Sequence, residues 1–148
     1  MHVEEGMRVA LVAVLFAISC APGRDDLGGY ANGVCEPTTR RDTQAVATTS
    51  GQFGVVGSTS VTADVEETLV IVWRSGGPAT SLVVMAYRLD PPSAGTWVRW
   101  SVGYGSASPW GEVGYRVGLK PISRPGCWRL VPEGGRTEDG VVIAMHGA

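Results

Sequence analysis

Histidine is the side chain that most often moves protons near neutral pH, and this chain of 148 residues has only His2 and His146. A Ser-His-Asp triad needs an imidazole held in place by the fold, whereas His146 lies at a chain end, where ends fray. No Gly-x-Ser-x-Gly elbow occurs. We therefore expect the protein not to be an enzyme.

Metal and phosphate chemistry lack their usual residues as well. A zinc site takes about four nitrogen, sulfur or oxygen ligands at ordered spacing, and the three cysteines, Cys20, Cys35 and Cys127, are widely separated. A phosphate-binding loop of the Gly-x-x-x-x-Gly-Lys type is absent, and Lys120 is the single lysine. These observations predict no metal and no cofactor.

The five tryptophans offer the best candidate for a binding site. Trp97 lies opposite the apolar face of its predicted strand, beside Arg99, and Trp110 lies in a loop. Two exposed indoles near Arg99 and Arg116 would form a platform for a sugar or a peptide. The alternative is that Trp97 is packed beneath a loop or the N-terminal segment. We expect the other tryptophans in the core: Trp73, Trp100 and Trp128.

Strands must position these side chains, because 21 glycines and 9 prolines disfavour a helical bundle. Residues 97–104 and 111–119 alternate between apolar and polar, the pattern of half-buried strands. Five further β-prone segments are separated by turn signals: 53–61, 68–74, 81–87, 127–131 and 141–145.

About seven strands and no convincing helix predict an all-β domain over residues 51–148. We expect a two-layer antiparallel β-sandwich of the immunoglobulin-like type, with a small open barrel as the alternative. A second layer is needed because a single sheet would leave one apolar face in water.

Composition excludes two further classes of protein. No run of about 18 apolar residues exists, so a polytopic membrane protein is excluded. A formal charge of −2 provides no electrostatic attraction for nucleic acid.

The N-terminal segment has the features of an export signal. Residues 9–18 form an apolar run that follows Arg8 and is too short to span a bilayer. Glu4 and Glu5 do not fit a positive leader, but a start at Met7 would remove them.

The sequence Ala17-Ile18-Ser19-Cys20 resembles the lipobox of bacterial lipoproteins, with Ala17 in place of the usual leucine. The resemblance implies removal of residues 1–19 and a diacylglycerol on Cys20, which would anchor the protein to a membrane of the cell envelope, on its extracytoplasmic side. Residues 20–50 are then expected to be a lipidated cysteine and flexible tether.

A lipidated Cys20 leaves Cys35 and Cys127 as a pair, and an oxidising envelope would allow them to form a disulfide. The alternative is two separate buried thiols.

The segment Arg124-Pro125-Gly126-Cys127-Trp128-Arg129-Leu130 resembles the closing hairpin of small immunoglobulin-like modules in envelope lipoproteins. The resemblance covers about 25 residues strongly and implies no catalytic residue. The sequence thus predicts a lipid-anchored module that binds an envelope protein or a glycan. A structural subunit of a membrane complex is the alternative, and a small envelope enzyme is the least favoured.

Overall fold

A computed structural model describes residues 27–44, 46–63, 68–74, 81–108, 111–122 and 124–148. The predicted signal segment and Cys20 lie outside the described residues. The strands are β1 (Gly29–Ala31), β2 (Val34–Glu36), β3 (Val46–Thr48), β4 (Phe53–Val56), β5 (Ser60–Thr62), β6 (Thr68–Trp73), β7 (Ser81–Arg88), β8 (Trp97–Tyr104), β9 (Ser106–Ser108), β10 (Gly111–Gly118), β11 (Gly126–Pro132) and β12 (Val141–His146). Two short 3-10 helices accompany them, η2 (Lys120–Ile122) and η3 (Thr137–Asp139).

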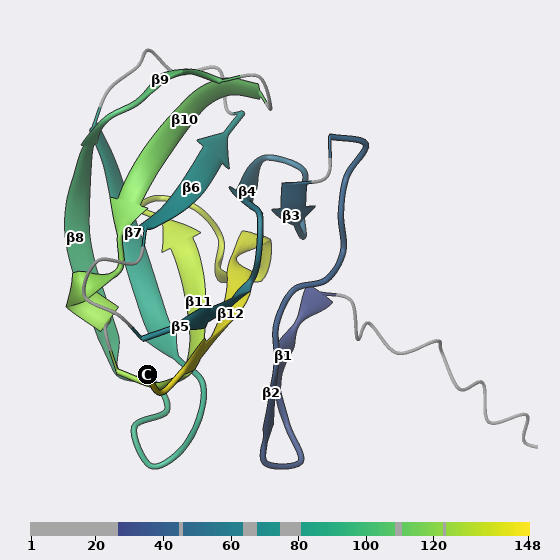
Figure 1. The fold of residues 1–148 in the computed structure, drawn as a ribbon, viewed down its shortest axis with the longest axis vertical. Helices are drawn as coiled ribbons and strands as arrows, with labels where there is room; N and C mark the ends of the chain where they lie inside the picture. Colours follow the sequence, from purple (N-terminus) through teal and green to yellow (C-terminus); the bar gives the residue numbers. More distant parts are fainter. Residues whose placement is uncertain (1–26, 45, 64–67, 75–80, 109–110, 123) are drawn as a thin grey trace, which may run out of the picture.

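Two five-stranded sheets pack face to face (Figure 1). Their strand orders are β3-β4-β6-β10-β9 and β5-β12-β11-β7-β8, and every neighbouring pair is antiparallel except β5 with β12. Within them, the orders β4-β6-β10-β9 and β12-β11-β7 are those of the two sheets of a seven-stranded immunoglobulin-like sandwich. The predicted all-β sandwich is confirmed.

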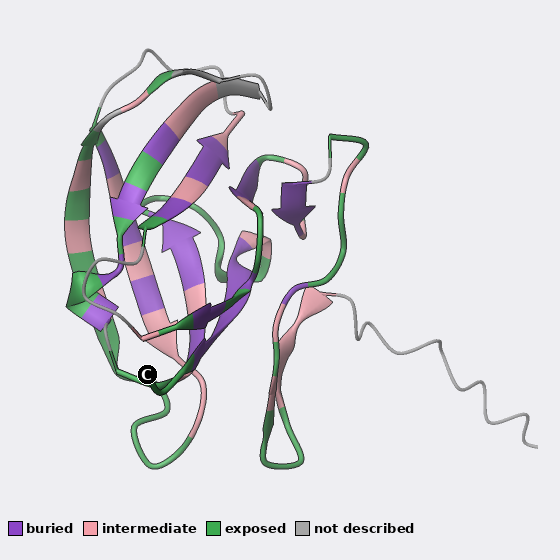
Figure 2. Ribbon diagram, in the orientation of Figure 1, coloured by how far each residue is buried: buried purple, intermediate pink, exposed green. Residues whose placement is uncertain are grey.

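The core lies between the sheets and receives every second side chain of the long strands (Figure 2). Both sheets contribute fully buried residues, among them Val55, Ile71, Val117, Leu82, Val84, Leu130 and Ile143. In β8, Val98, Trp100 and Val102 pack against this core, as the alternation predicted. The opposite residues of the strand, Trp97 and Arg99, are therefore left on the outer face.

Three strands, β1, β2 and β3, lie within the predicted tether of residues 20–50 and contradict that part of the prediction. β1 and β2 make a hairpin around Asn32-Gly33, both with positive φ, the geometry of a tight two-residue turn. β3 pairs with β4 and buries Val46 and Ala47. The domain thus begins well before residue 51, since these short strands gain stability from packing rather than from an apolar pattern of their own.

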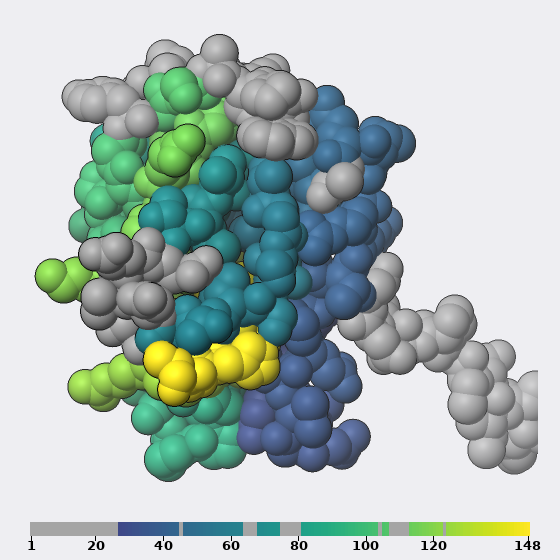
Figure 3. Space-filling view, viewed as in Figure 1, coloured from purple at the N-terminus to yellow at the C-terminus, as the bar shows by residue number. Residues whose placement is uncertain are grey.

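A disulfide fastens the hairpin to the sandwich. The sulfur atoms of Cys35 and Cys127 are 2.06 Å apart, and the two Cα atoms are 5.3 Å apart. The pair predicted from the cysteine count is therefore at bonding distance, and the alternative of two separate thiols is wrong. The hairpin lies against β12, so that the early and late parts of the chain meet on one surface (Figure 3).

Thr38 forms a second attachment beside the hairpin and is fully buried. Its hydroxyl donates to the carbonyl of Leu27 at 2.8 Å and accepts the N–H of Val142 at 2.9 Å. Its backbone N–H donates to the carbonyl of Val142 at 2.9 Å, and its carbonyl accepts the Thr59 hydroxyl at 2.8 Å. Thr38 thus provides hydrogen-bond partners for the N–H and carbonyl of Val142, on a part of the β12 edge that does not pair with β5.

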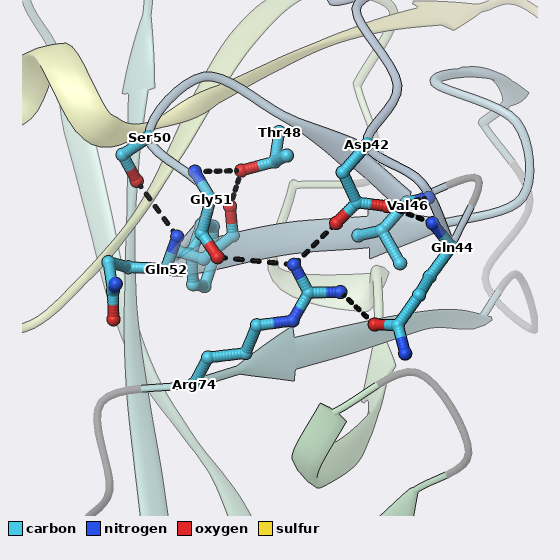
Figure 4. A network of polar contacts seen from close by, with 9 residues as sticks. Asp42, Gln44, Val46, Thr48, Ser50, Gly51, Gln52 and Arg74 are labelled. Atoms are coloured by element: carbon cyan, nitrogen blue, oxygen red, sulfur yellow. Dashed lines mark hydrogen bonds and ion pairs between the residues drawn. The ribbon is translucent and has the colours of Figure 1, made fainter.

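A third attachment joins the loop before β3 to the end of β6 (Figure 4). Arg74 pairs with Asp42 and also donates to the side chain of Gln44 at 2.6 Å and to the carbonyl of Gly51 at 3.2 Å. Asp42 in turn accepts the backbone N–H of Gln44 and Val46. Partial burial alone would raise the pKa of Asp42, but these hydrogen bonds outweigh it and lower the pKa.

A candidate ligand-binding hollow

The structure separates Arg116 from Trp97 and Arg99, three residues of the predicted platform. Trp97 and Arg99 lie on the outer face of β8, and Trp97 is 57% exposed as a residue, so the alternative of a packed Trp97 is wrong. Arg116 is exposed on β10, whose alternate residues Tyr115 and Val117 enter the core. Because β8 and β10 belong to different sheets, the outward residues of the two strands face opposite directions. Trp110 lies outside the described residues.

Arg99 has a partner within the protein. Its Nε lies 2.6 Å from Oε1 of Glu133, and its Nη2 lies 3.1 Å from Oε2, so the two side chains form a bidentate ion pair. This guanidinium lowers the pKa of Glu133. The backbone N–H of Glu133 also donates to Val83 at 2.9 Å. Arg99 therefore holds the segment after β11 against the sheet.

Trp97 instead lines a hollow at the end of the sandwich, where the 89–96 loop, η2 and the start of β11 meet. Its volume is about 440 Å³, within the range of small-molecule sites. We call it the tryptophan hollow. Its lining includes Arg88, Ser93, Thr96, Trp97, Arg124 and Trp128. Val98 and the buried Ile122 also line it.

Trp128 forms the buried wall of the tryptophan hollow. It pairs in register with Arg88 on β7, and the Arg88 guanidinium lies 5.0 Å from the centre of the indole ring, in cation–π contact. The indole N–H donates to the backbone carbonyl of Arg124 at 3.2 Å. Gly126 nearby has a φ of 149°, which favours glycine, and a Cβ there would lie 2.3 Å from Arg88 Cζ and displace the guanidinium. The Pro-Gly-Cys-Trp turn thus makes room for this arginine.

Asp90 neutralises Arg88 from the side of the disulfide. Its two oxygens accept hydrogen bonds from Arg88 at 2.6 and 2.7 Å, and one of them also accepts the backbone N–H of Cys127 at 2.7 Å. Partial burial would raise the pKa of Asp90, but these donors outweigh burial and lower it. Asp90 therefore links the disulfide, Arg88 and the hollow in one polar network.

Arg124 carries a charge that the described residues do not neutralise. Its side chain is exposed and makes no hydrogen bond or ion pair within the described part of the chain. Across the hollow, Thr96 donates its hydroxyl to the carbonyl of Ser93 at 2.7 Å. Its hydroxyl oxygen keeps lone pairs as acceptors, and the Ser93 hydroxyl is a further polar group of the lining. The hollow combines aromatic, cationic and hydroxyl groups.

Sequence reasoning found Trp97 but missed the residues that surround it. Arg88, Ser93 and Thr96 flank or occupy a loop, and Arg124 precedes β11 by two residues, so the fold alone brings them together. Trp128 was expected in the core and is buried, yet it also lines the hollow. The signal available in the sequence was that Trp97 and Trp128 each lie near the start of a predicted strand with an arginine a few residues away.

A second hollow, of about 370 Å³, lies beside the disulfide and includes His146. On the adjoining edge, the Ser60 hydroxyl and Nε2 of His146 are 2.7 Å apart, a contact that the sequence did not predict. A nucleophile–base pair usually has a third group orienting the imidazole. Within the described residues, no carboxylate hydrogen-bonds His146. The geometry provides an exposed edge contact between β5 and β12.

No group of three or more metal-ligating side chains gathers among the described residues. The helices in that part of the chain are too short to cross a bilayer. In comparisons with protein-family models, curated proteins and solved structures, the chain has no match.

Proposed function

We propose that this protein is a lipid-anchored, non-catalytic binding module of a bacterial cell envelope. Cys20 would carry the lipid, and the tryptophan hollow would hold a component of the envelope, either a glycan or part of a protein. The proposal joins the lipobox-like Ala17-Ile18-Ser19-Cys20 to a folded domain with a mixed polar and aromatic hollow.

The observation that supports the proposal most directly is the Cys35–Cys127 pair. Of three cysteines, it leaves Cys20, the residue that the lipobox-like sequence presents for modification. Disulfides persist in oxidising compartments, and the extracytoplasmic side of a bacterial membrane is such a place. Export, disulfide formation and lipidation therefore require the same location.

The test is membrane fractionation of cells that express the wild-type chain or Cys20→Ala. The wild-type protein should sediment with membranes, and the variant should not, because one residue carries the whole anchor. Ser19→Ala is the matched control: it keeps the cysteine and a small residue before it, and its fractionation should equal that of the wild type.

Intact mass of the membrane-extracted protein provides the second readout. We expect a chain that begins at Cys20 with a diacylglycerol, and two thiols that react only after reduction. An unprocessed chain with three reactive thiols would contradict the proposal. Stoichiometric co-purification of another protein that remains with Trp97→Ala would favour the structural subunit of a membrane complex over a binding module.

A further inference from the structure

We propose that the tryptophan hollow binds a sugar that bears a carboxylate, as found in acidic glycans. In this arrangement the indole of Trp97 packs against the sugar ring, and the guanidinium of Arg124 pairs with the carboxylate. The inference rests on the proposed binding function and specifies the ligand of that site.

The exposed indole of Trp97 favours a ring-shaped ligand. Trp97 and Val34 are the two large apolar residues that are exposed in the described part of the chain, and Trp97 is the first residue of β8. Cross-strand pairing with Tyr87 holds its backbone in place. An exposed indole on a strand provides a flat apolar surface with little loss of conformational entropy on binding. The apolar face of a sugar ring matches such a surface.

The charges of the lining favour an acidic ligand. Two arginines and no carboxylate are found among the residues that line the hollow. The charge of Arg88 is already neutralised by Asp90. Asp90 also accepts the Cys127 N–H and lines the second hollow, beside the disulfide. Arg124 remains to pair with the ligand. A guanidinium binds a planar carboxylate through two parallel hydrogen bonds between opposite charges, which are stronger than its hydrogen bonds to the hydroxyls of a neutral sugar.

The hydroxyl groups favour a sugar over an acidic peptide. Ser93 and Thr96 lie on the same loop and line the hollow beside Trp97. Their oxygens can accept from, and the Ser93 hydroxyl can donate to, the several hydroxyls of a sugar ring. A glutamate side chain has no hydroxyls to meet them.

The experiment is isothermal titration of the detergent-purified full-length protein with tetragalacturonic acid, with maltotetraose as the neutral probe of equal length. We expect binding of the acid alone, weakening as salt is added. Trp97→Ala and Arg124→Gln should each reduce the affinity about ten-fold. Arg116→Gln, which removes the same charge from the other sheet, should leave the affinity unchanged.

Four outcomes would overturn the inference: no binding of tetragalacturonic acid at millimolar concentration, equal binding of maltotetraose, equal binding of tetraglutamate, or equal weakening by Arg116→Gln. The proposed function has a separate test. If membrane fractionation follows Cys20 and the protein retains envelope material in a Trp97-dependent manner while the acidic sugar fails, the module stands and its ligand class is wrong.

Discussion

Asp90 is the residue on which the end of the sandwich depends. It receives three hydrogen bonds, two from Arg88 and one from the Cys127 backbone, and its side chain is only 15% exposed. Arg88 in turn covers the ring of Trp128. Loss of this carboxylate would leave a guanidinium without its partner beside the hollow.

Asp90→Asn should reduce the free energy of unfolding by about 2 kcal/mol at neutral pH, because hydrogen bonds to a charged group are lost. The pKa of Asp90 is lowered in the folded protein, so the unfolded chain takes up the proton more readily. The stabilisation is therefore complete above about pH 4 and is lost as the pH falls toward the folded pKa. Urea unfolding at a series of pH values should show a smaller acid-dependent loss in the variant.

Asp139→Asn is the matched control for this series. Its carboxylate pairs with Arg136, whose side chain is 72% exposed, so the substitution should change stability little. Equal pH dependence of the wild type and Asp90→Asn would contradict the role given to Asp90.

Thr38→Val should reduce the free energy of unfolding by about 1–3 kcal/mol, since the N–H of Val142 and the carbonyl of Leu27 each lose a partner. Valine has nearly the same shape as threonine, so the change isolates the hydroxyl. Urea titration checks the result. Thr38→Ser keeps the hydroxyl and should retain most of the stability; a stable Thr38→Val variant would contradict the role given to the hydroxyl.

At the scale of elements, the β1–β2 hairpin depends on its covalent link. Strands of three residues bury little, and Tyr30 and Val34 remain partly or largely exposed. The hairpin stays in place through the Cys35–Cys127 bond and the hydrogen bonds of Thr38.

Replacing both cysteines, Cys35→Ala with Cys127→Ala, should reduce the free energy of unfolding by about 4 kcal/mol, because the bond closes a loop of 92 residues. Thermal unfolding with and without a thiol reductant checks this result. The wild type under reduction should unfold near the temperature of the double variant, which should itself be insensitive to the reductant. An unchanged wild type under confirmed reduction would argue against the link.

The sequence predicted β8 and β10 well because each of these strands is half buried. In β8 and β10, one face meets the core and the other meets water, so apolar and polar residues alternate. The short strands β1, β2 and β3 have no room for such a pattern. A local signal is nevertheless present, since Asn32-Gly33 is a typical hairpin turn, but the surrounding glycines and threonines have the composition of a tether.

The candidate site was only half predictable, for a different reason. Trp97 is exposed because side chains alternate between the two faces of β8, a pattern that the local sequence shows. Its neighbours follow from sheet order: Arg99 and Arg116 look similar along the sequence, yet their strands belong to different sheets. Arg124 and Trp128 reach Trp97 through the packing of β11 beside β7, which the strand pattern alone does not specify.

At the scale of the whole molecule, the chain forms two sheets with a hairpin closing over one of them. The outer face of β12 is covered, so that Val142 and Ala144 are buried although they point away from the core. The N-terminal hairpin and the C-terminal strand therefore stabilise each other, and the disulfide, Asp90 and the tryptophan hollow follow one another along the same end of the sandwich.

If Cys20 carries the proposed lipid, the early start of the folded domain would limit the distance between the domain and the membrane. Leu27 is already held by Thr38, only seven residue steps after Cys20. A fully extended chain of that length spans at most about 25 Å. A lipid on Cys20 would thus keep the sandwich close to the bilayer surface, and not at the end of a flexible tether of thirty residues. The tryptophan hollow would then bind only polymers that extend to the lipid headgroups.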